Sequence, residues 1–196
     1  MKCLEGAFTI PVNMKDAYAV HQAVWKVLYG HLGENQSLRD YVFNSYAHPT
    51  QPDCSYVEVR LPAESKVAGE LREHLRPKEY QFDQDEIVWI EGRIATLKRV
   101  DGREILVPED ELDTWATRVF ENQGLQLEGV TWSEPELFHA NNHKKKEGAM
   151  RFSFMTRRYN AMVKVVDPSA AQTAMLKGIG RKRACGTGMI KLEVLD

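Results

Sequence analysis

A tyrosine and a histidine lie one helical turn apart near the start of the sequence. Tyr18, His21 and Trp25 are spaced by three and four residues, which places them on one face of a helix. The ordinary pKa of histidine is about 6.5, so an imidazole can take or give a proton near neutral pH. A tyrosine one turn away could orient a hydroxyl group or hydrogen-bond a phosphate. Two interpretations stay open: the stripe packs against a neighbouring element, or Tyr18 and His21 border a cleft.

The hydrophobic pattern around this pair predicts the helix that must position it. Residues 14–29 have apolar side chains at helical spacing. Val20, Val24 and Val27 form a stripe of their own, which we expect to face the core. Because these valines supply the core-facing side, His21 is not needed there.

A second motif, near the other end of the sequence, combines glycines with basic residues. Glycines permit positive φ angles and let a backbone approach a phosphate, to which its N–H groups can donate. The spacing fits neither a P-loop nor a dinucleotide-binding fingerprint. A plain tight turn between a helix and a strand is the alternative. The residues concerned are Gly178, Gly180, Gly186 and Gly188, with Arg181, Lys182 and Arg183 between them.

Charge is distributed unevenly along the chain. Residues 137–191 contain twelve Lys or Arg and two acidic residues, a net charge of +10, whereas residues 1–136 carry −10. The whole chain has a formal net charge of −2. A basic surface of this size suits a polyanion such as RNA. The alternative is a solvated basic loop near residues 143–151, but a second basic cluster, Lys177 and Arg181–Arg183, lies beside glycines and favours the polyanion.

Composition limits the class of protein and its compartment. The 196 residues suffice for one large domain or two smaller ones, and 43% hydrophobic residues with 28% charged residues exclude a disordered chain. No apolar run approaches the ~18 residues that span a bilayer, and the first residues lack the features of a signal peptide. The cysteines (Cys3, Cys54, Cys185) are far apart, which argues against a disulfide framework or a cysteine-rich zinc site. We therefore expect a cytoplasmic protein with no membrane partner, no metal and no cofactor.

Alternating periodicities predict an α+β fold built from two similar halves. Each half has the order βαββαβ, which predicts two tandem ferredoxin-like domains of the kind also found in RNA-recognition motifs. We place the first domain at residues 1–84 and the second at residues 85–196. The RNP string of RNA-recognition motifs is absent, so RNA contacts should use loops and grooves. The predicted strands are 2–10, 38–47, 55–61, 77–82, 87–99, 125–132, 152–166 and 189–194; the predicted helices are 14–29, 64–75, 108–123 and 168–177.

The two motifs together resemble a known family. Residues 18–25 (YAVHQAVW) and residues 178–190 (GIGRKRACGTGMI) resemble the helix and the glycine-rich signature of the CasE family. These proteins are the CRISPR repeat-processing endoribonucleases of type I-E systems. One departure is Thr187, which stands where relatives often have cysteine.

The resemblance implies an activity and its residues. It implies metal-independent cleavage at the base of the stem-loop in precursor crRNA by 2′-hydroxyl attack. The products carry a 2′,3′-cyclic phosphate or 3′-phosphate and a 5′-hydroxyl, and the crRNA is retained with other subunits of an interference complex. His21 and Tyr18 are the implied catalytic residues, whereas a second catalytic cation has no assigned position. The implied RNA-binding residues are Lys144, Lys145, Lys146, Arg151, Arg157, Arg158, Arg181, Lys182, Arg183, Gly178, Gly180, Gly186 and Gly188.

Two other functions remain as alternatives. The first is a non-catalytic subunit of a ribonucleoprotein complex that binds an RNA hairpin and in which His21 is structural. The second is a small-molecule enzyme or regulator on a ferredoxin-like scaffold, which leaves the +10 segment unexplained.

Overall fold

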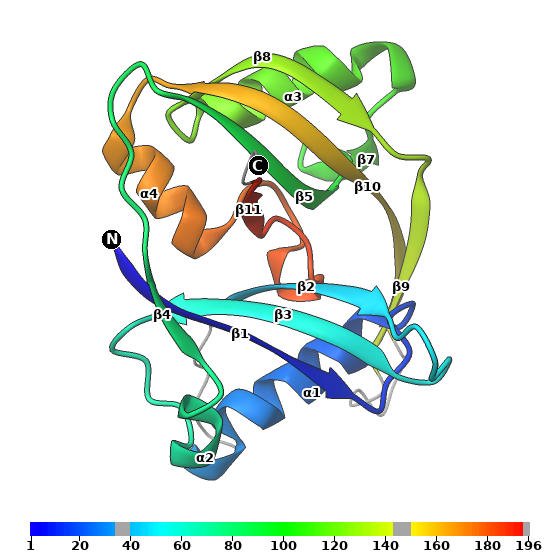
Figure 1. Ribbon diagram of the computed structural model, residues 1–196. Helices are drawn as coiled ribbons and strands as arrows, with labels where there is room; N and C mark the ends of the chain where they lie inside the picture. The colour runs from blue at the N-terminus through cyan, green and yellow to red at the C-terminus, as the bar shows by residue number, and fades with distance from the viewer. Residues whose placement is uncertain (34–39, 143–149, 194–196) are drawn as a thin grey trace.

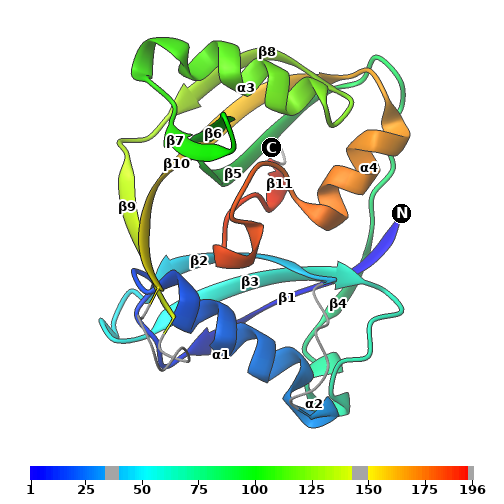
Figure 2. The same ribbon diagram turned by 180° about the vertical axis from the view of Figure 1, so that it is seen from behind.

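Two antiparallel sheets face each other, with α1 and α3 on their outer sides and α4 between them at one edge (Figures 1 and 2). The computed structural model describes residues 1–33, 40–142 and 150–193. Helix α1 lies on the outer side of the first sheet and α3 on the outer side of the second, while the segment that leads into β11 lies between the sheets. The two halves of the chain therefore meet through the inner faces of their sheets.

The first sheet has the strand order β2-β3-β1-β4, with every pair antiparallel. Its element order βαββαβ, together with this strand order, is the ferredoxin-like topology. The elements are β1 (Lys2–Ile10), α1 (Ala17–Tyr29), the 3-10 turn η1 (Gly30–Leu32), β2 (Val42–Ala47), β3 (Ser55–Pro62), α2 (Gly69–Arg72) and β4 (Arg76–Glu79).

The second sheet repeats this arrangement as β11-β5-β10-β8 and adds two hairpins. Strands β6 and β7 form a two-stranded sheet, and β9 pairs with the first half of the long strand β10. The elements are β5 (Ile87–Ala95), β6 (Leu97–Val100), β7 (Arg103–Leu106), η2 (Glu109–Glu111), α3 (Leu112–Glu121), β8 (Leu125–Trp132), β9 (Glu136–Asn142), β10 (Met150–Val165), α4 (Pro168–Lys177), η3 (Arg183–Cys185) and β11 (Ile190–Leu192).

The predicted α+β fold of two tandem ferredoxin-like domains is confirmed. Strand β1 and helix α4 occupy the predicted residues. The carboxylate of Asp167 caps α4 by accepting from the N–H groups of Ser169 and Ala170, at 3.0 Å each. The division of the domains at residue 84 lies between β4 and β5 and stays a proposal.

Two predicted elements differ from the structure. The helix expected at residues 64–75 is reduced to the four residues of α2. Arg72 explains this, because its guanidinium donates to the carbonyls of Ala63 and Ser65 and holds that segment in a loop. The strand expected at 87–99 breaks at Thr96, whose N–H donates to Met155 O while its carbonyl accepts from Val107.

Strand β9 and one valine also depart from expectation. Part of the segment expected as a long basic loop pairs with β10 as β9. Val27 was expected in the core but is 38% exposed, and Leu28 is fully buried instead. The buried stripe of α1 thus runs at a spacing of four residues through Val20, Val24 and Leu28.

A buried arginine connects the two domains. Arg60 of β3 is 1% exposed, and its Nη1 donates to the carbonyls of Met175 (2.9 Å) and Ile190 (2.7 Å) in the second domain. Its other nitrogens bind Glu5 and the hydroxyl of Tyr80 within the first domain. An interior charge is stable only when it is paired and hydrogen-bonded in this way.

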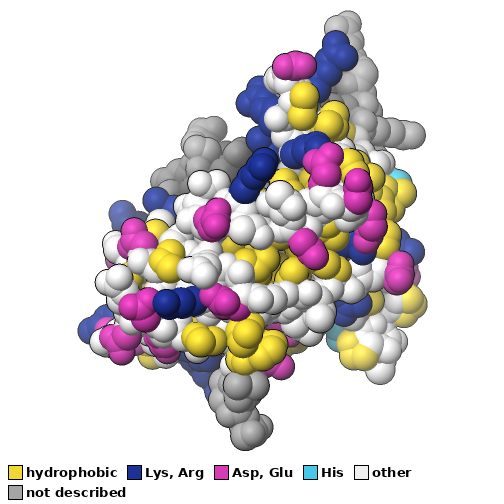
Figure 3. Space-filling view, turned by 90° about the horizontal axis from the view of Figure 1, so that it is seen from above, with side chains coloured by type: hydrophobic (Ala, Val, Ile, Leu, Met, Phe, Trp, Pro, Cys, Tyr) yellow, Lys and Arg dark blue, Asp and Glu magenta, His cyan; other side chains and the backbone are white. Residues whose placement is uncertain are grey.

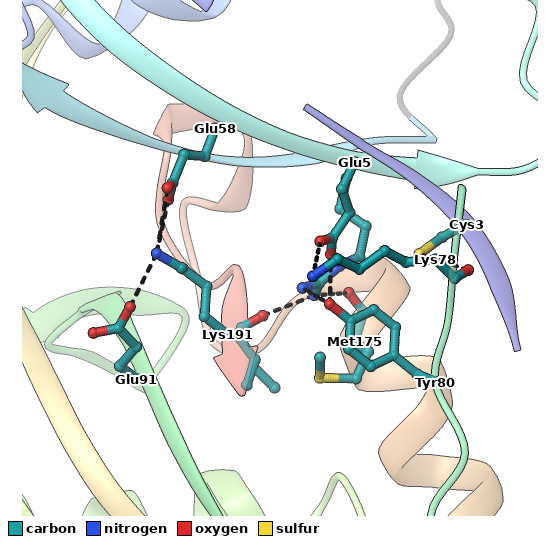
Figure 4. A network of polar contacts seen from close by, with 10 residues as sticks. Cys3, Glu5, Glu58, Lys78, Tyr80, Glu91, Met175 and Lys191 are labelled. Carbon is teal, nitrogen blue, oxygen red and sulfur yellow. Dashed lines mark hydrogen bonds and ion pairs between the residues drawn. The ribbon is translucent and has the colours of Figure 1, made fainter. Parts of the chain in front are cut away.

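Further polar contacts fix the same interface. Lys191 of β11 lies between Glu58 (3.2 Å) and Glu91 (3.0 Å), one from each domain (Figure 4). Arg93 of β5 donates from Nη1 to the carbonyl of Ser45 at 2.6 Å. Because donors cross the interface in both directions, the position of the first domain relative to the second is well defined.

Candidate functional site

Helix α1 is anchored at its start, and this sets the direction of its side chains. Asp16 caps the helix by accepting from the N–H of Ala19 at 3.1 Å. The N–H of His139 in β9 donates to Lys15 O, which joins the beginning of the helix to the second domain. The position of α1 therefore depends on both domains.

The three residues of the Tyr18–His21–Trp25 stripe have different surroundings. Tyr18 packs, partly buried, against a small core that includes Phe138 and Phe154. Trp25 packs against the core of the first domain. His21 lies between them, partly exposed, and borders a pocket. The packing interpretation thus fits Tyr18 and Trp25, and the cleft interpretation fits His21.

Tyr41, at the start of β2, holds the His21 ring. The Tyr41 hydroxyl lies 3.3 Å from His21 Nδ1, and the two rings are nearly parallel, at 16°, with centroids 6.3 Å apart. Tyr41 is 9% exposed and packs on Tyr29 and Phe43. A buried aromatic cluster therefore fixes the side chain that contacts the imidazole.

A hydrogen-bonded group supports this cluster from behind. The Tyr29 hydroxyl donates to Asp40, which also accepts from the Ser65 hydroxyl at 2.7 Å. Burial and the hydrogen bond to Asp40 raise the pKa of Tyr29, so its hydroxyl remains a donor at neutral pH. Asp40 in turn lies at the edge of the His21 pocket.

His21 and the basic residues of the glycine-rich segment line one pocket. The pocket has a volume of about 720 Å³, and the first domain contributes His21, Asp40 and Tyr41 to it. The second domain contributes four cations, which are Lys177, Arg181, Lys182 and Arg183. Residues 156 or more positions from His21 in the sequence thus meet it in space.

The protein itself orients these cations. Arg183 donates from Nη1 to the carbonyls of Lys177 (2.9 Å) and Gly178 (3.3 Å) at the end of α4. Lys182 Nζ lies 4.5 Å from the centroid of the Phe152 ring, a cation–π contact. A partly exposed arginine and lysine in fixed positions can bind a phosphate without a large loss of side-chain freedom.

The glycine-rich segment adopts the positive φ angles that its sequence predicts. Gly178, Gly180, Gly186 and Gly188 all have φ between +70° and +87°. At Gly188 an added Cβ would lie 2.1 Å from the carbonyl oxygen of Ile179, so glycine is required there. The backbone at Gly188 is thus packed closely against the backbone at Ile179.

The expectation that the N–H groups of this segment bind phosphate is wrong for five residues. The N–H groups of Gly178, Ile179, Cys185, Gly186 and Gly188 all donate to protein carbonyls. Thr187 is fully buried, and its hydroxyl donates to Arg181 O at 2.9 Å. These bonds shape the segment, and the basic side chains rather than these amides face the pocket.

The remaining predicted RNA-binding residues lie elsewhere. Arg157 is largely buried, pairs with Glu109 and donates to Ser133 O at 2.9 Å. Arg158 is 59% exposed, pairs with Glu136 and lines a different groove of about 620 Å³ between the sheets. Lys144, Lys145 and Lys146 lie outside the described residues, as does the side chain of Arg151.

Several basic residues in the described part of the +10 segment form ion pairs with acidic residues. Acidic and basic side chains lie beside one another over the face seen in Figure 3. Lys164 pairs with Asp85, and Lys191 pairs with two glutamates. Acidic residues from the rest of the chain thus compensate part of this charge.

Two residues of the site were missed from the sequence, Tyr41 and Glu104 of β7. The region containing Tyr41 is predicted as a strand. The contact of Tyr41 with His21 on α1, however, is created by tertiary packing. Glu104 lines the His21 pocket and pairs with Arg181 and Lys182. Periodicity carries no signal for either contact.

The described part of the chain has neither a metal-binding cluster nor a membrane-spanning helix. It holds no group of three or more His, Cys, Asp or Glu side chains arranged to bind a metal ion. None of the helices in the described ranges is both long and apolar enough to cross a bilayer.

Several solved structures have the same fold. Cse3 of Thermus thermophilus, bound to an RNA that represents a pre-cleavage complex, aligns with a TM-score of 0.71 at 15% identity, over 99% of this chain and 100% of that chain. Cas6e of Escherichia coli K-12 aligns with a TM-score of 0.64 at 19% identity, over the full length of both chains. A chain of a CRISPR RNA-guided surveillance complex aligns with a TM-score of 0.68 at 16% identity, also over both full lengths. At these identities the likeness establishes a shared fold.

The sequence itself gives the family. Comparison with curated protein sequences produced no match. A family model described as CRISPR associated protein matches residues 9–193, a span that contains both His21 and the glycine-rich segment. The chain therefore belongs to the CRISPR associated protein family, which confirms the relationship that its two motifs predict.

Proposed function

We propose that the chain is a metal-independent endoribonuclease that binds the repeat stem-loop of a CRISPR transcript and cuts at the base of the stem. The observation that carries this proposal is the pocket in which His21 of one domain meets Lys177 and Arg181–Arg183 of the other. Two structures with this fold support it, since one is Cse3 bound to an RNA that represents a pre-cleavage complex and the other is a CRISPR RNA-guided surveillance complex.

The proposed reaction uses the RNA's own nucleophile. The 2′-oxygen attacks the adjacent phosphorus, and the bond from phosphorus to the 5′-oxygen breaks. This leaves a 2′,3′-cyclic phosphate, or the 3′-phosphate formed from it, and a 5′-hydroxyl. His21 takes the proton of the 2′-hydroxyl or gives one to the departing 5′-oxygen, a role that contributes roughly 10²–10⁴-fold.

The cations of the second domain stabilise the negative charge of the transition state. The pentacovalent phosphorus carries an additional negative charge in the transition state. Lys177, Arg181 and Arg183 border the same pocket as His21, and oriented cations stabilise such charge more than water does. One of these three residues is the second catalytic cation that has no assigned position in the sequence.

Two tyrosines have proposed supporting roles. Tyr41 fixes the orientation of the imidazole through its contact with Nδ1. Tyr18 lies one turn before His21 on α1 and remains the proposed partner of the RNA at the scissile position, although in this structure it packs against Phe138 and Phe154. Substrate would have to approach the exposed part of its ring.

Stem recognition should rest on shape and on phosphate contacts, because side chains cannot read the deep major groove of A-form RNA. We propose that the product hairpin stays bound and that the chain joins other subunits of an interference complex. The proposed phosphate contacts outside the pocket are Lys144, Lys145, Lys146, Arg151, Arg157 and Arg158.

Incubation of the protein with labelled repeat RNA in excess EDTA tests this function. The proposal predicts one cut at the base of the stem, with a 5′-hydroxyl on the downstream fragment and a cyclic phosphate on the upstream one. A shifted but intact hairpin would support the non-catalytic binding subunit instead. No affinity for the hairpin at low salt would contradict both.

A further inference from the structure

The hairpin β6–β7 extends beside the His21 pocket. Its two strands pair with each other, and its side chains Val100, Ile105 and Leu106 are between 41% and 52% exposed. A two-stranded hairpin has little stability of its own. Its contacts with the rest of the protein therefore determine where it lies.

One of these contacts is made by Glu104 at the rim of the pocket. The Glu104 carboxylate lies 2.6 Å from Lys182 Nζ and 3.4 Å from Arg181 Nη1. Glu104 is ionised at neutral pH, as an ordinary carboxyl group is, and the hydrogen bond from Lys182 lowers its pKa further. The Glu104 carboxylate thus forms ion pairs with two of the four cations that line the pocket with His21.

Glu104 offers these cations the same kind of acceptor as a phosphate, an anionic oxygen. Its two oxygens accept from a lysine and an arginine at the place where the proposed function requires the RNA backbone. The side chains of the three residues are 22–38% exposed, so the pairs are open to solvent and exchange readily.

Other contacts hold the cations when the carboxylate leaves. Lys182 has a φ of +58° and lies over the Phe152 ring, and the backbone of Arg181 is bridged to Ala95. Neither contact involves Glu104. Departure of the carboxylate therefore leaves the Lys182 ammonium over the Phe152 ring and the Arg181 backbone in place.

We propose that Glu104 is a specificity-determining residue, an internal counter-ion that the RNA backbone must displace from Arg181 and Lys182. This inference rests on the proposed function. An RNA that contacts only Arg181 and Lys182 replaces the carboxylate with a phosphate at these cations. Its net gain in binding free energy is therefore small. A hairpin that also reaches the rest of the site overcomes this competition, so Glu104 weakens non-specific RNA more than the repeat hairpin.

The test compares Glu104→Gln with a matched control, Glu111→Gln, in the full chain. Glutamine keeps the size and one acceptor oxygen of glutamate while it removes the charge. Glu111 is a half-exposed carboxylate of the same domain that pairs with Lys98, and it is not among the residues that line the pocket. Thermal unfolding of both variants establishes that they fold.

Affinity is measured for the repeat hairpin and for a single-stranded oligouridine over a range of salt concentrations. Glu104→Gln should bind oligouridine about three- to tenfold more tightly, with a smaller gain for the hairpin. The plot of log affinity against log salt should steepen by about 0.7, the value for one further phosphate contact with a single strand. Glu111→Gln should stay within twofold of the wild type for both RNAs.

Two results would overturn the inference. Equal behaviour of the two variants would show that Glu104 does not compete with RNA, and weaker binding by Glu104→Gln would show that it positions the cations instead. In either case a wild-type protein that still cuts the hairpin leaves the proposed function intact. If Glu104→Gln fails to fold, Glu104→Asp replaces it. Its shorter side chain reaches the cations less well, so tighter oligouridine binding than that of Glu111→Gln supports the competition and weaker binding overturns it.

Discussion

Two groups of cations near the domain interface differ in how their charge is satisfied. Arg60 is 1% exposed and donates to four protein oxygens. Arg181 and Lys182 are 38% and 22% exposed and share the single carboxylate of Glu104. The first arrangement has no donor group facing solvent and fixes the two domains. The second can exchange its anion, as a nucleic-acid site requires.

Arg60 is a charge that holds the fold together, whereas Arg181 and Lys182 are charges that we propose bind RNA. Burial makes the Arg60 network expensive to disturb, because a lone charge left inside the protein has no water to solvate it. Because the ion pairs of Glu104 are exposed to solvent, breaking them costs little free energy. The domain interface therefore serves the pocket by holding His21 at a fixed position relative to Lys177 and Arg183.

The largest effect on stability is expected for Arg60→Ala. This change leaves Glu5, whose side chain is only 16% exposed, without its main partner and should reduce the free energy of unfolding by about 3–5 kcal/mol. Lys78→Ala is the matched control, since Lys78 also pairs with Glu5, at 3.6 Å, but is 57% exposed. It should cost about 0–1 kcal/mol. Denaturant unfolding measures both, and equal losses would contradict the distinction between the two groups.

A smaller loss is expected when the glycine-rich segment is disturbed. Gly188→Ala places a Cβ against Ile179 O at a φ of +87° and should cost about 1–3 kcal/mol. Cleavage should fall as well, because the cations on this segment move. Gly69→Ala is the control: no atom lies within 4 Å of its added Cβ, so stability should be unchanged or rise by up to about 1 kcal/mol. Thermal unfolding that treats the two variants alike would refute the packing argument.

Removal of one hydroxyl tests the support of His21. Tyr41→Phe keeps the ring packed on Tyr29 and Phe43 but loses the contact with Nδ1. Single-turnover cleavage should slow by about three- to tenfold, the value of one hydrogen bond, and its pH profile should shift. Hairpin affinity should stay the same. A lower affinity with an unchanged rate constant would assign Tyr41 to RNA binding instead.

The smallest effect is a pH dependence of stability from Glu5. Burial alone would raise the pKa of Glu5, but the charge of Arg60 and the hydrogen bonds from Tyr80 and Arg60 outweigh it and lower the pKa. The unfolded state then binds a proton more readily than the folded state. Stability from this group is present above about pH 4.5 and is lost as the pH falls below it. Acid unfolding of Glu5→Gln should show a shallower slope than that of the wild type.

The parts of the fold that are predictable from the sequence depend on local signals. Helix α4 follows an aspartate cap and begins with a proline, and β8 follows a glycine, so both occupy the predicted residues. The failures involve distant contacts. Arg72 ties the segment before α2 into a loop, and the pairing of β9 with β10 depends on a hairpin that periodicity does not show.

The same distinction holds for the site. His21 and the basic glycine-rich segment are recognisable from residue type and spacing. The contacts of Tyr41 with His21 and of Glu104 with Lys182 join residues 20 and 78 positions apart, and tertiary packing creates both. Sequence patterns identify residues whose side chains can catalyse a reaction or bind a ligand. They do not identify the neighbouring residues that orient these side chains or neutralise their charge.

Single-turnover cleavage of the labelled repeat hairpin by His21→Ala, with hairpin affinity measured in parallel, addresses the catalytic assignment most directly. The proposed general acid–base role predicts a rate constant lower by roughly 10²–10⁴-fold and an affinity within a few-fold of the wild type. Undiminished cleavage by the purified variant in excess EDTA would contradict the role of this imidazole.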